Sequence, residues 1–167
     1  MWTEVYWVAG PWPGKLAVSP RPRGGDWLED AIAGWRRDGV DQVLSLLTPG
    51  EEKDLDLERE AHLAQGQGIK FRSFPIPDRQ VPASGPALAQ ILGVINKDLA
   101  SGKNVLIHCR QGIGRTGLVA ACLLVSQGLD PATAIDRVSS ARGLPVPETD
   151  EQKHWIDRYA AVAAGAK

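Results

Sequence analysis

The amino-acid sequence predicts a single α/β domain with a central, largely parallel sheet and helices on both faces. Short apolar runs typical of buried strands alternate with longer segments of helical periodicity, which is the pattern of parallel strands joined by crossover helices. The chain has 167 residues, 43% of them hydrophobic, which is enough to bury one sizeable core. It contains no internal repeat and no dividing linker, so we expect one domain over residues 1–167.

The first elements predicted along the chain are two short strands and a helix. The strands are predicted over residues 4–9 and 15–19, on either side of a turn rich in glycine and proline. Asp26 and Glu29 have the spacing of a capping box, in which each side chain bonds the backbone of the other position. We therefore expect a helix to start there and to end at Gly39.

A strand, a helix and another strand follow, over residues 43–47, 54–65 and 69–76. Before this helix, Glu51 and Glu52 come directly after a Pro-Gly pair. Acidic side chains suit the positive end of the helix dipole, so we expect both to open a short helix.

The second half of the chain begins with an amphipathic helix that ends at Gly102. A strand over residues 104–108 then leads through a loop into an apolar helix over residues 114–127, which we expect to be the most buried one. Two more helices are predicted, over residues 131–142 and from Thr149 onward. The amphipathic helix is recognised by its apolar face: Leu88, Ile91, Leu92, Ile95 and Leu99.

The loop between strand 104–108 and the apolar helix is the most informative segment. A buried strand that runs through glycines into a helix points several backbone N–H groups, and the positive end of the helix dipole, into one small bowl. Such a bowl suits a tetrahedral dianion. The loop reads His108-Cys109-Arg110-Gln111-Gly112-Ile113-Gly114-Arg115-Thr116.

The residue types in this loop point to nucleophilic catalysis on a phosphate. Cys109 would attack as the thiolate, which a helix N-terminus, converging N–H donors and a nearby cation all favour. The guanidinium of Arg115 can hold two phosphate oxygens at once, and the hydroxyl of Thr116 can donate to the sulfur. Glycines suit positions of positive φ or close approach to the anion. We therefore expect the phosphate to be bound by Arg110, Gln111, Gly112, Ile113, Gly114 and Arg115.

The His-Cys-x5-Arg-Thr pattern resembles the signature loop of the cysteine-dependent protein tyrosine phosphatase superfamily. The whole chain is similar to its compact dual-specificity branch, which includes the cyclin-dependent-kinase-associated phosphatase and bacterial relatives. The resemblance implies a tyrosine-phosphatase-like catalytic domain, a phosphocysteine intermediate and no metal or other cofactor. Rhodanese-like sulfurtransferases also place a cysteine at an anion-binding turn, but their loop is typically one residue shorter and lacks the Arg-Thr ending.

Two further residues are candidates for proton transfer and water activation. Asp78 follows a strand on a loop stiffened by prolines and resembles the general acid of the compact phosphatases, although a Pro-Asp pair also favours an ordinary turn. Gln152 resembles the glutamine that orients the attacking water in the second step. Thr149 and Gln152 also have the spacing of a capping box, so both interpretations stay open.

Other polar residues are expected to support the site or to lie outside it. The resemblance implies that His108 supports the loop and tunes the thiolate through hydrogen bonds. Arg142 could brace the loop, bind a second anionic group or be a charge at a helix end. Arg21 and Arg23 could border the substrate cleft or lie on an exposed proline-rich loop. Cys122 is expected in the apolar core, too far along its helix for a disulfide with the nucleophile.

Composition and charge restrict the partners. A net charge of −1 offers no argument for nucleic acid or an anionic membrane. No apolar run approaches the roughly 18 residues of a membrane span, and the first residues do not resemble a signal peptide, so we expect a cytoplasmic monomer. His62 and His154 have no partner at metal-ligand spacing, and no metal site is predicted.

The expected substrate is a phosphorylated protein. Larger, tyrosine-specific family members carry a tyrosine-bearing loop that deepens the pocket, and this chain has only Tyr6 and Tyr159, in a strand and a terminal helix. A shallower pocket would admit phosphoserine and phosphothreonine beside phosphotyrosine. The alternative is an inositol phosphate or phosphoinositide, with which Arg110 is compatible and the uncharged Gln111 and Ile113 are less so. A module that binds without turnover usually lacks the catalytic residues that this chain keeps.

Overall fold

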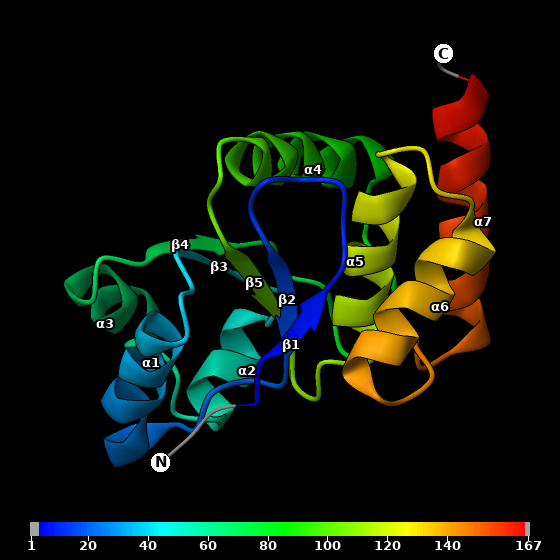
Figure 1. Ribbon diagram of the computed structural model, residues 1–167. Helices are drawn as coiled ribbons and strands as arrows, with labels where there is room; N and C mark the ends of the chain where they lie inside the picture. The colour runs from blue at the N-terminus through cyan, green and yellow to red at the C-terminus, as the bar shows by residue number, and fades with distance from the viewer. Residues whose placement is uncertain (1–3, 166–167) are drawn as a thin grey trace.

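A five-stranded sheet forms the centre of the structure, with the strand order β1-β2-β5-β3-β4 (Figure 1). The structure is a computed structural model that describes residues 4–165. All neighbouring strands are parallel except β1, which runs antiparallel to β2 at one edge. The predicted, largely parallel sheet is therefore confirmed, and its strands are β1 (Tyr6–Val8), β2 (Leu16–Ser19), β3 (Gln42–Ser45), β4 (Lys70–Ser73) and β5 (Val105–His108).

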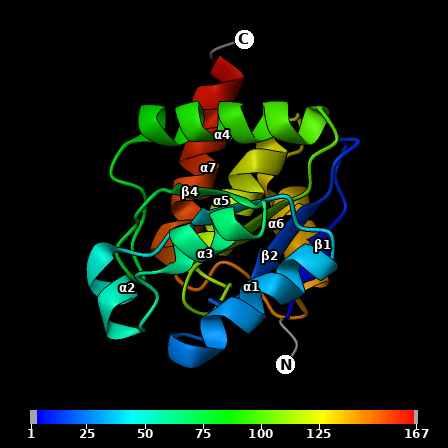
Figure 2. The same ribbon diagram turned by 90° about the vertical axis from the view of Figure 1, so that its left-hand side faces the viewer.

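Helices cover both faces of this sheet, as predicted (Figures 1 and 2). On one side lie α4 (Gly85–Ala100), α5 (Arg115–Val125), α6 (Pro131–Arg142) and α7 (Asp150–Gly165). On the other side lie α1 (Leu28–Arg37) and α3 (Glu60–Gly66), and the short α2 (Pro49–Asp54) follows β3. Within residues 4–165, none of these helices has the length and apolar character to cross a bilayer.

The strands divide the apolar side chains between two cores because successive side chains point to opposite faces. In β5, Leu106 packs with α1 and α3, whereas Val105 and Ile107 pack with the four helices of the other face. Every residue of α5 is buried, which confirms the expectation for the apolar helix. Cys122 is one of them, a free and fully buried thiol, as predicted.

The short helix expected to open at Glu51 and Glu52 is α2, but the helix expected over residues 54–65 begins later than predicted. α2 ends at Asp54 and α3 begins at Glu60. Between them Asp56 adopts φ 56°, a left-handed conformation that ends a helix. The turn also buries Leu57 completely in the core. No glycine or proline marks this turn in the sequence, so periodicity alone placed the start of the second helix too early.

The capping box expected at Asp26 and Glu29 is also not formed. α1 begins at Leu28, after the 3-10 turn η1 (Gly25–Trp27), and its first turn has no side-chain cap. The chain before η1 is instead positioned by packing. Gly24 lies so close to the segment after α2 that a Cβ on it would be 2.1 Å from the carbonyl oxygen of Leu55.

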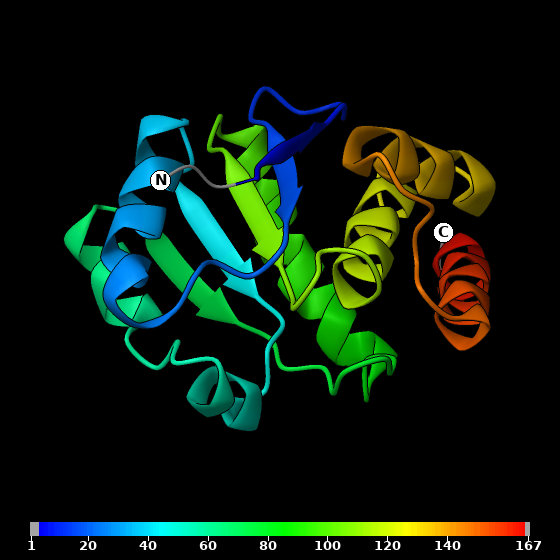
Figure 3. The same cartoon turned by 90° about the horizontal axis from the view of Figure 1, so that it is seen from below.

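The carboxyl ends of three neighbouring parallel strands lie level with one another. Ser19 of β2 and Ser45 of β3 both pair with His108 of β5. The loops that follow these strands therefore meet at one edge of the sheet, which Figure 3 shows from below. Open α/β sheets bind ligands at this edge.

Candidate active site

The loop from Cys109 to Arg115 connects the end of β5 to the start of α5. No backbone N–H of residues 110–115 donates a hydrogen bond within the described part of the chain. These amides are thus free to bind an anion, and they lie beside the N-terminus of a buried helix. The geometry is the bowl that the sequence predicts.

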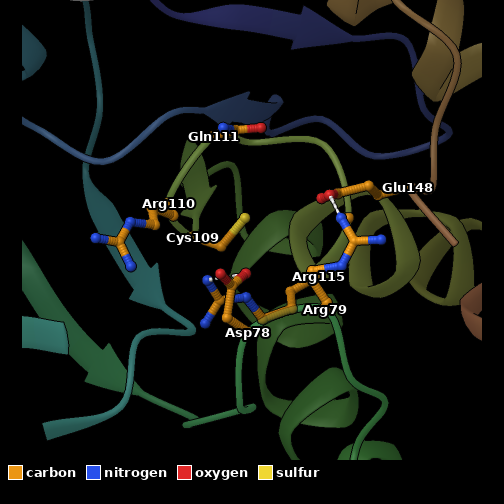
Figure 4. Close-up of a pocket in the computed structure, with 8 residues that line it drawn as sticks. Asp78, Arg79, Cys109, Arg110, Gln111, Arg115 and Glu148 are labelled. Carbon is orange, nitrogen blue, oxygen red and sulfur yellow. Dashed lines mark hydrogen bonds and ion pairs between the residues drawn. The ribbon is translucent and has the colours of Figure 1, made fainter. Parts of the chain in front are cut away.

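A cavity of about 200 Å³ lies over this loop (Figure 4). It brings the predicted nucleophile Cys109, the predicted phosphate-binding Arg115 and the predicted acid Asp78 to one place. The other predicted residues, Gly112, Ile113, Thr116, Gln152 and His108, do not line it. Its walls are formed by Asp78, Arg79, Cys109, Arg110, Gln111, Gly114, Arg115 and Glu148.

The Arg115 side chain is almost completely buried and is held by three groups. Its Nη1 donates to Glu51 Oε1 at 2.6 Å and to the Ile76 carbonyl at 2.8 Å. Its Nη2 donates to Glu51 Oε2 at 2.9 Å and to Asp78 Oδ1 at 3.0 Å. Burial disfavours the charged guanidinium, but the hydrogen bonds to Glu51 and the negative charges of Cys109, Glu51 and Asp78 outweigh it and raise the pKa of Arg115.

Glu51 is the residue that sequence reasoning missed at this site. It was expected only to open a helix, and it does so in a complete capping box with Thr48. Its carboxylate also forms the two-pronged ion pair with Arg115. Burial opposes ionisation, yet the hydrogen bonds from Arg115 and the Thr48 backbone lower the pKa of Glu51. The capping-box spacing of Thr48 and Glu51 after a buried strand indicates a helix start there. It does not indicate that the Glu51 carboxylate pairs with Arg115.

Asp78 reaches the cavity because its loop is anchored on both sides. Upstream, Ile76 is buried and its N–H donates to the Leu46 carbonyl at 3.0 Å. Downstream, Arg79 adopts φ 63° and forms an ion pair with Glu148 at the rim (Figure 4). The side chain of Asp78 is 47% exposed and contacts Arg115, so the carboxyl faces the space above the loop.

Gln152 lies behind the loop and is fully buried. Its Oε1 accepts hydrogen bonds from the N–H groups of Glu148 and Thr149, which confirms the capping box with Thr149. Its Nε2 donates to the Gln80 carbonyl on the loop of Asp78 at 3.1 Å. A Cβ on Gly114 would lie 3.0 Å from Gln152 Oε1, which explains why glycine stands at that position. A role in orienting water stays a prediction.

Arg142 braces the loop, which is one of the three roles considered for it. Its Nε donates to the Gly112 carbonyl at 3.2 Å and its Nη2 to the Gln111 carbonyl at 3.0 Å. Its guanidinium also lies 4.5 Å from the centre of the Tyr6 ring. Gly112 itself has φ 72°, and a Cβ there would lie 2.6 Å from the carbonyl group of Ser19.

For Arg21 and Arg23, near the end of β2, the sequence left two alternatives: a border of the substrate cleft or an exposed proline-rich loop. The backbone N–H of Arg21 donates to the Arg110 carbonyl at 3.2 Å, so this segment does lie against the loop. However, the Arg21 guanidinium bonds the Pro22 carbonyl, and that of Arg23 lies over the Trp27 ring. Neither guanidinium lines the cavity.

His108 and Thr116 flank the nucleophile on its buried side. The imidazole Nδ1 of His108 lies 3.2 Å from the Cys109 carbonyl oxygen, as expected of a residue that supports the loop. The hydroxyl of Thr116 is buried and has no hydrogen-bond partner within residues 4–165. The predicted hydrogen bond from Thr116 to the Cys109 sulfur is therefore not formed in this structure.

This geometry agrees with the relatives of the chain. A family model described as "Tc-R-P: Polymorphic toxin system, DSP-PTPase phosphatase" matches residues 19–129. The chain belongs to the DSP-PTPase phosphatases. Among curated proteins, the rat protein named Cyclin-dependent kinase inhibitor 3 is 32% identical over 123 residues, which are 72% of this chain and 58% of the rat protein. The chain thus spans less than two thirds of that relative's length.

Solved structures of phosphatases share the fold of this DSP-PTPase phosphatase over nearly its whole length. Kinase associated phosphatase, with its catalytic-site cysteine replaced by serine, superimposes with a TM-score of 0.90 at 22% identity, covering 98% of this chain and 97% of that chain. Tk-PTP in its active form gives 0.77 at 28% identity, covering 96% and 99%. PTPMT1 in complex with PI(5)P gives 0.76 at 15% identity, covering 96% and 98%. The compact dual-specificity phosphatase fold is confirmed.

Proposed function

We propose that this chain is a metal-independent phosphatase that hydrolyses phosphotyrosine, phosphoserine and phosphothreonine in proteins through a phosphocysteine intermediate. One observation carries the proposal. The thiol of Cys109, the cation of Arg115 and the carboxyl of Asp78 line a single cavity above a loop of free backbone amides. A nucleophile, an anion-binding cradle and an acid are the groups that phosphoryl transfer to sulfur requires.

In the first step the Cys109 thiolate attacks phosphorus, and the sulfur–phosphorus bond forms as the bond to the leaving oxygen breaks. Arg115 and the loop amides stabilise the charge on the equatorial oxygens. Asp78 donates its proton to the leaving oxygen.

In the second step water attacks the phosphocysteine, the sulfur–phosphorus bond breaks and the thiolate is restored. Asp78, now a carboxylate, accepts the proton from this water. Gln152 supports the step by fixing the Asp78 loop through the Gln80 carbonyl. The hydroxyl of Thr116 can stabilise the departing sulfur by donating a hydrogen bond to it. This hydroxyl is buried and has no hydrogen-bond partner within residues 4–165, so its side chain can rotate towards the sulfur without breaking another hydrogen bond.

Protein substrates are supported by the residues that line the cavity and by the relatives. Tyr6 stacks on Arg142 and Tyr159 on Trp155, and neither tyrosine lines the cavity. The cavity therefore lacks, within the described residues, a tyrosine wall that would select an aromatic phosphoester. Relatives named Cyclin-dependent kinase inhibitor 3 and kinase associated phosphatase also favour phosphoproteins.

A phosphoinositide or inositol phosphate is the second candidate. The observation in its favour is that Arg110 lines the cavity with its side chain 44% exposed; its only ion pair within the described residues is a long one to Glu51, at 3.8 Å, which a further phosphate would replace. The fold is shared with PTPMT1, whose structure holds PI(5)P. The uncharged Gln111 lies beside Arg110 on the same wall, which is why we rank this substrate second.

The deciding experiment is a comparison of kcat/KM for phosphotyrosine, phosphothreonine and phosphoserine peptides and for inositol phosphates, all in the presence of a metal chelator. We expect turnover of the peptides, with the ratio of tyrosine to threonine reporting the depth of the pocket. A preference for inositol phosphates would instead favour the second candidate, a phosphoinositide or inositol phosphate substrate. Activity that the chelator abolishes would contradict a metal-independent reaction.

Cys109→Ser is the blank for this comparison and the first prediction. Because a hydroxyl is a much weaker nucleophile than a thiolate, we expect kcat to fall at least about a thousandfold while phosphate binding persists. Rapid acid quench of the wild type followed by mass spectrometry should find phosphate on the peptide that contains Cys109. Multiple turnover by Cys109→Ser would contradict the nucleophile assignment.

A further inference from the structure

A second buried ion pair lies behind the nucleophile, and the reaction just described does not use it. His108 and Glu60 are both completely buried, and His108 Nε2 lies 2.6 Å from Glu60 Oε2. Glu60 comes from the first position of α3, on the face of the sheet opposite to α5. Its other oxygen, Oε1, is buried without a hydrogen-bond partner in the described residues.

The contacts of the imidazole determine how many protons the pair holds. Nδ1 faces the Cys109 carbonyl oxygen, which can only accept, so Nδ1 carries a proton. Nε2 faces a carboxylate oxygen, and the short distance requires a proton there too. The imidazole therefore carries a proton on each ring nitrogen, and the one on Nε2 is donated to Glu60.

The same contacts orient the peptide bond that follows the nucleophile. His108 holds the Cys109 carbonyl on the buried side of the loop. In a trans peptide the N–H points opposite to the C=O, so the Arg110 N–H points away from the imidazole. This N–H is one of the free amides of the anion-binding loop. The ring itself cannot tilt freely, because the Trp35 ring lies 5.8 Å from it, centre to centre.

Stability alone is a weak reason for such a pair. Burying two charges costs several kcal/mol of desolvation, and apolar residues of the same volume often stabilise a protein as well or better. The pair nevertheless stands one residue from the nucleophile and touches its carbonyl. A buried acid and base in direct contact with a nucleophile's own backbone are better placed to act on the site than on stability.

We propose that Glu60 is a positioning residue for the reaction: through His108 it keeps a doubly protonated imidazole behind Cys109 and the Cys109 carbonyl turned away from the cavity. The imidazole lies between Glu60 and Cys109, so its positive charge is nearer the nucleophile than the negative charge of Glu60. The pair thereby favours the thiolate and orients one amide of the phosphate cradle. This inference rests on the proposed function, since it deepens the role of the same nucleophile.

The charged groups around the pair come from two sides. On α2, Glu52 acts on it: burial raises the pKa of Glu52, the charge of Glu60 raises it further and that of His108 lowers it, with Glu58 a smaller neighbour. On the loop side the neighbouring ionisable residue is Cys109, whose carbonyl oxygen contacts His108. Glu52 has no hydrogen bond to His108, which makes it a matched control for charge without contact.

The test is the pH dependence of Cys109 alkylation by iodoacetamide, which needs no turnover. Cys122 does not interfere, because its thiol is buried and burial raises its pKa. In Glu60→Gln the amide can still donate to Nε2, so the contact survives while the negative charge that holds a proton on Nε2 is lost. We expect the midpoint of the alkylation rate to move to higher pH, slowing alkylation about three- to tenfold below the midpoint.

Two comparisons decide the outcome. Glu52→Gln should leave the alkylation midpoint where the wild type has it, and adding Glu60→Gln to His108→Asn should cause little change beyond His108→Asn alone. The inference is overturned if Glu60→Gln keeps the wild-type midpoint, or if Glu52→Gln shifts it equally. Failure of the wild type to hydrolyse any phosphoester would overturn the proposed function instead, and the alkylation measurement would still stand.

A measurement on the wild type covers the case in which Glu60→Gln does not fold. ¹⁵N NMR of the histidine rings can separate His108 from His62 and His154, which are exposed on α3 and α7. We expect the His108 ring to carry a proton on Nδ1, donated to the Cys109 carbonyl oxygen, and one on Nε2, donated to Glu60. A His108 ring with an unprotonated Nδ1 would overturn the inference.

Discussion

Arg115 is the residue on which the charges of the active site depend. It is one of the largest fully buried side chains of the protein, and it faces three negative or potentially negative groups, Glu51, Asp78 and Cys109. The Glu51 carboxylate accepts hydrogen bonds from both terminal nitrogens of the guanidinium, and Asp78 accepts one from Nη2 on the cavity side. The guanidinium is thus oriented before any phosphate arrives, which is the condition for electrostatic catalysis.

Asp78→Ala should separate substrates by their leaving groups. A poor leaving group such as an alkyl phosphate needs a proton, so we expect its kcat/KM to fall roughly 10²–10⁴-fold. An activated aryl ester such as p-nitrophenyl phosphate needs it far less and should fall by less than about tenfold. The measurement is steady-state kinetics on both esters, and equal losses would remove Asp78 from the acid role.

Glu51→Gln should lower both activity and stability in a pH-dependent way. The folded-state pKa of Glu51 lies below its ordinary value of 4.5, so the carboxylate stabilises the protein above that pH and this stability is lost as pH falls through the lower folded value. We expect a loss of about 3 kcal/mol at pH 7, because the buried Arg115 loses its anionic partner.

Thermal unfolding from pH 7 to pH 3 checks this prediction. The difference in Tm between the wild type and Glu51→Gln should be largest at neutral pH and should shrink towards acid pH. A difference that stays constant with pH would show that the carboxylate charge contributes nothing.

At the scale of elements, the conformation of the phosphate-binding loop depends on its contacts with β2 and α6. Gly112 has positive φ and lies against the Ser19 carbonyl at the end of β2, while Arg142 of α6 holds the Gly112 and Gln111 carbonyls. These carbonyls are turned outward, which leaves the amides of the loop free. The cradle is therefore a product of β2 and α6 as much as of its own sequence.

Gly112→Ala should disturb the loop and lower activity. The positive φ costs a side chain about 1–2 kcal/mol, and the new Cβ would press on the Ser19 backbone. We expect a lower Tm and at least about a tenfold loss of kcat/KM, measured on p-nitrophenyl phosphate.

Gly128→Ala is the matched control for Gly112→Ala. Gly128 also has positive φ, 103°, but no atom lies within 4 Å of its Cβ position. It should lose similar stability from the backbone conformation and keep its activity. Equal losses of activity in the two variants would mean that the loop contact has no special role.

At the scale of the whole molecule, the site is assembled from segments that lie far apart in the chain. The loop after β5, the Asp78 loop, α2 and the segment before α7 all meet at the carboxyl edge of the sheet (Figure 3). The two apolar cores on either side of the sheet keep these segments in register. Damage to a core remote from the edge should therefore lower stability without changing the chemistry.

Leu92→Ala tests this separation. Leu92 of α4 is 1% exposed in the core beside the sheet and does not line the cavity. We expect a loss of about 2–5 kcal/mol in the free energy of unfolding, from transfer and from the space left behind. At temperatures well below Tm, kcat/KM should equal that of the wild type. Val162→Ala, at a side chain 74% exposed, should change neither quantity.

The sequence alone specified the parts of the molecule that are local along the chain. A buried strand, a glycine-bearing loop and an apolar helix follow one another directly, so the α/β class, the free amides around Cys109 and the direction of α5 could be predicted. The proline-stiffened loop of Asp78 was predictable for the same reason, and so was the capping box of Gln152. These features could be predicted because they depend on residues that are neighbours in the sequence and share one stretch of backbone.

Only the tertiary structure decided which distant groups complete the site. Glu51 on Arg115, Glu60 on His108 and Arg142 on the loop carbonyls are contacts between segments that the parallel sheet brings to one edge. Local spacing carries no information about such partners. The late start of α3 escaped prediction for a related reason, since burial of Leu57 in the assembled core, rather than a glycine or proline, accompanies the turn before it.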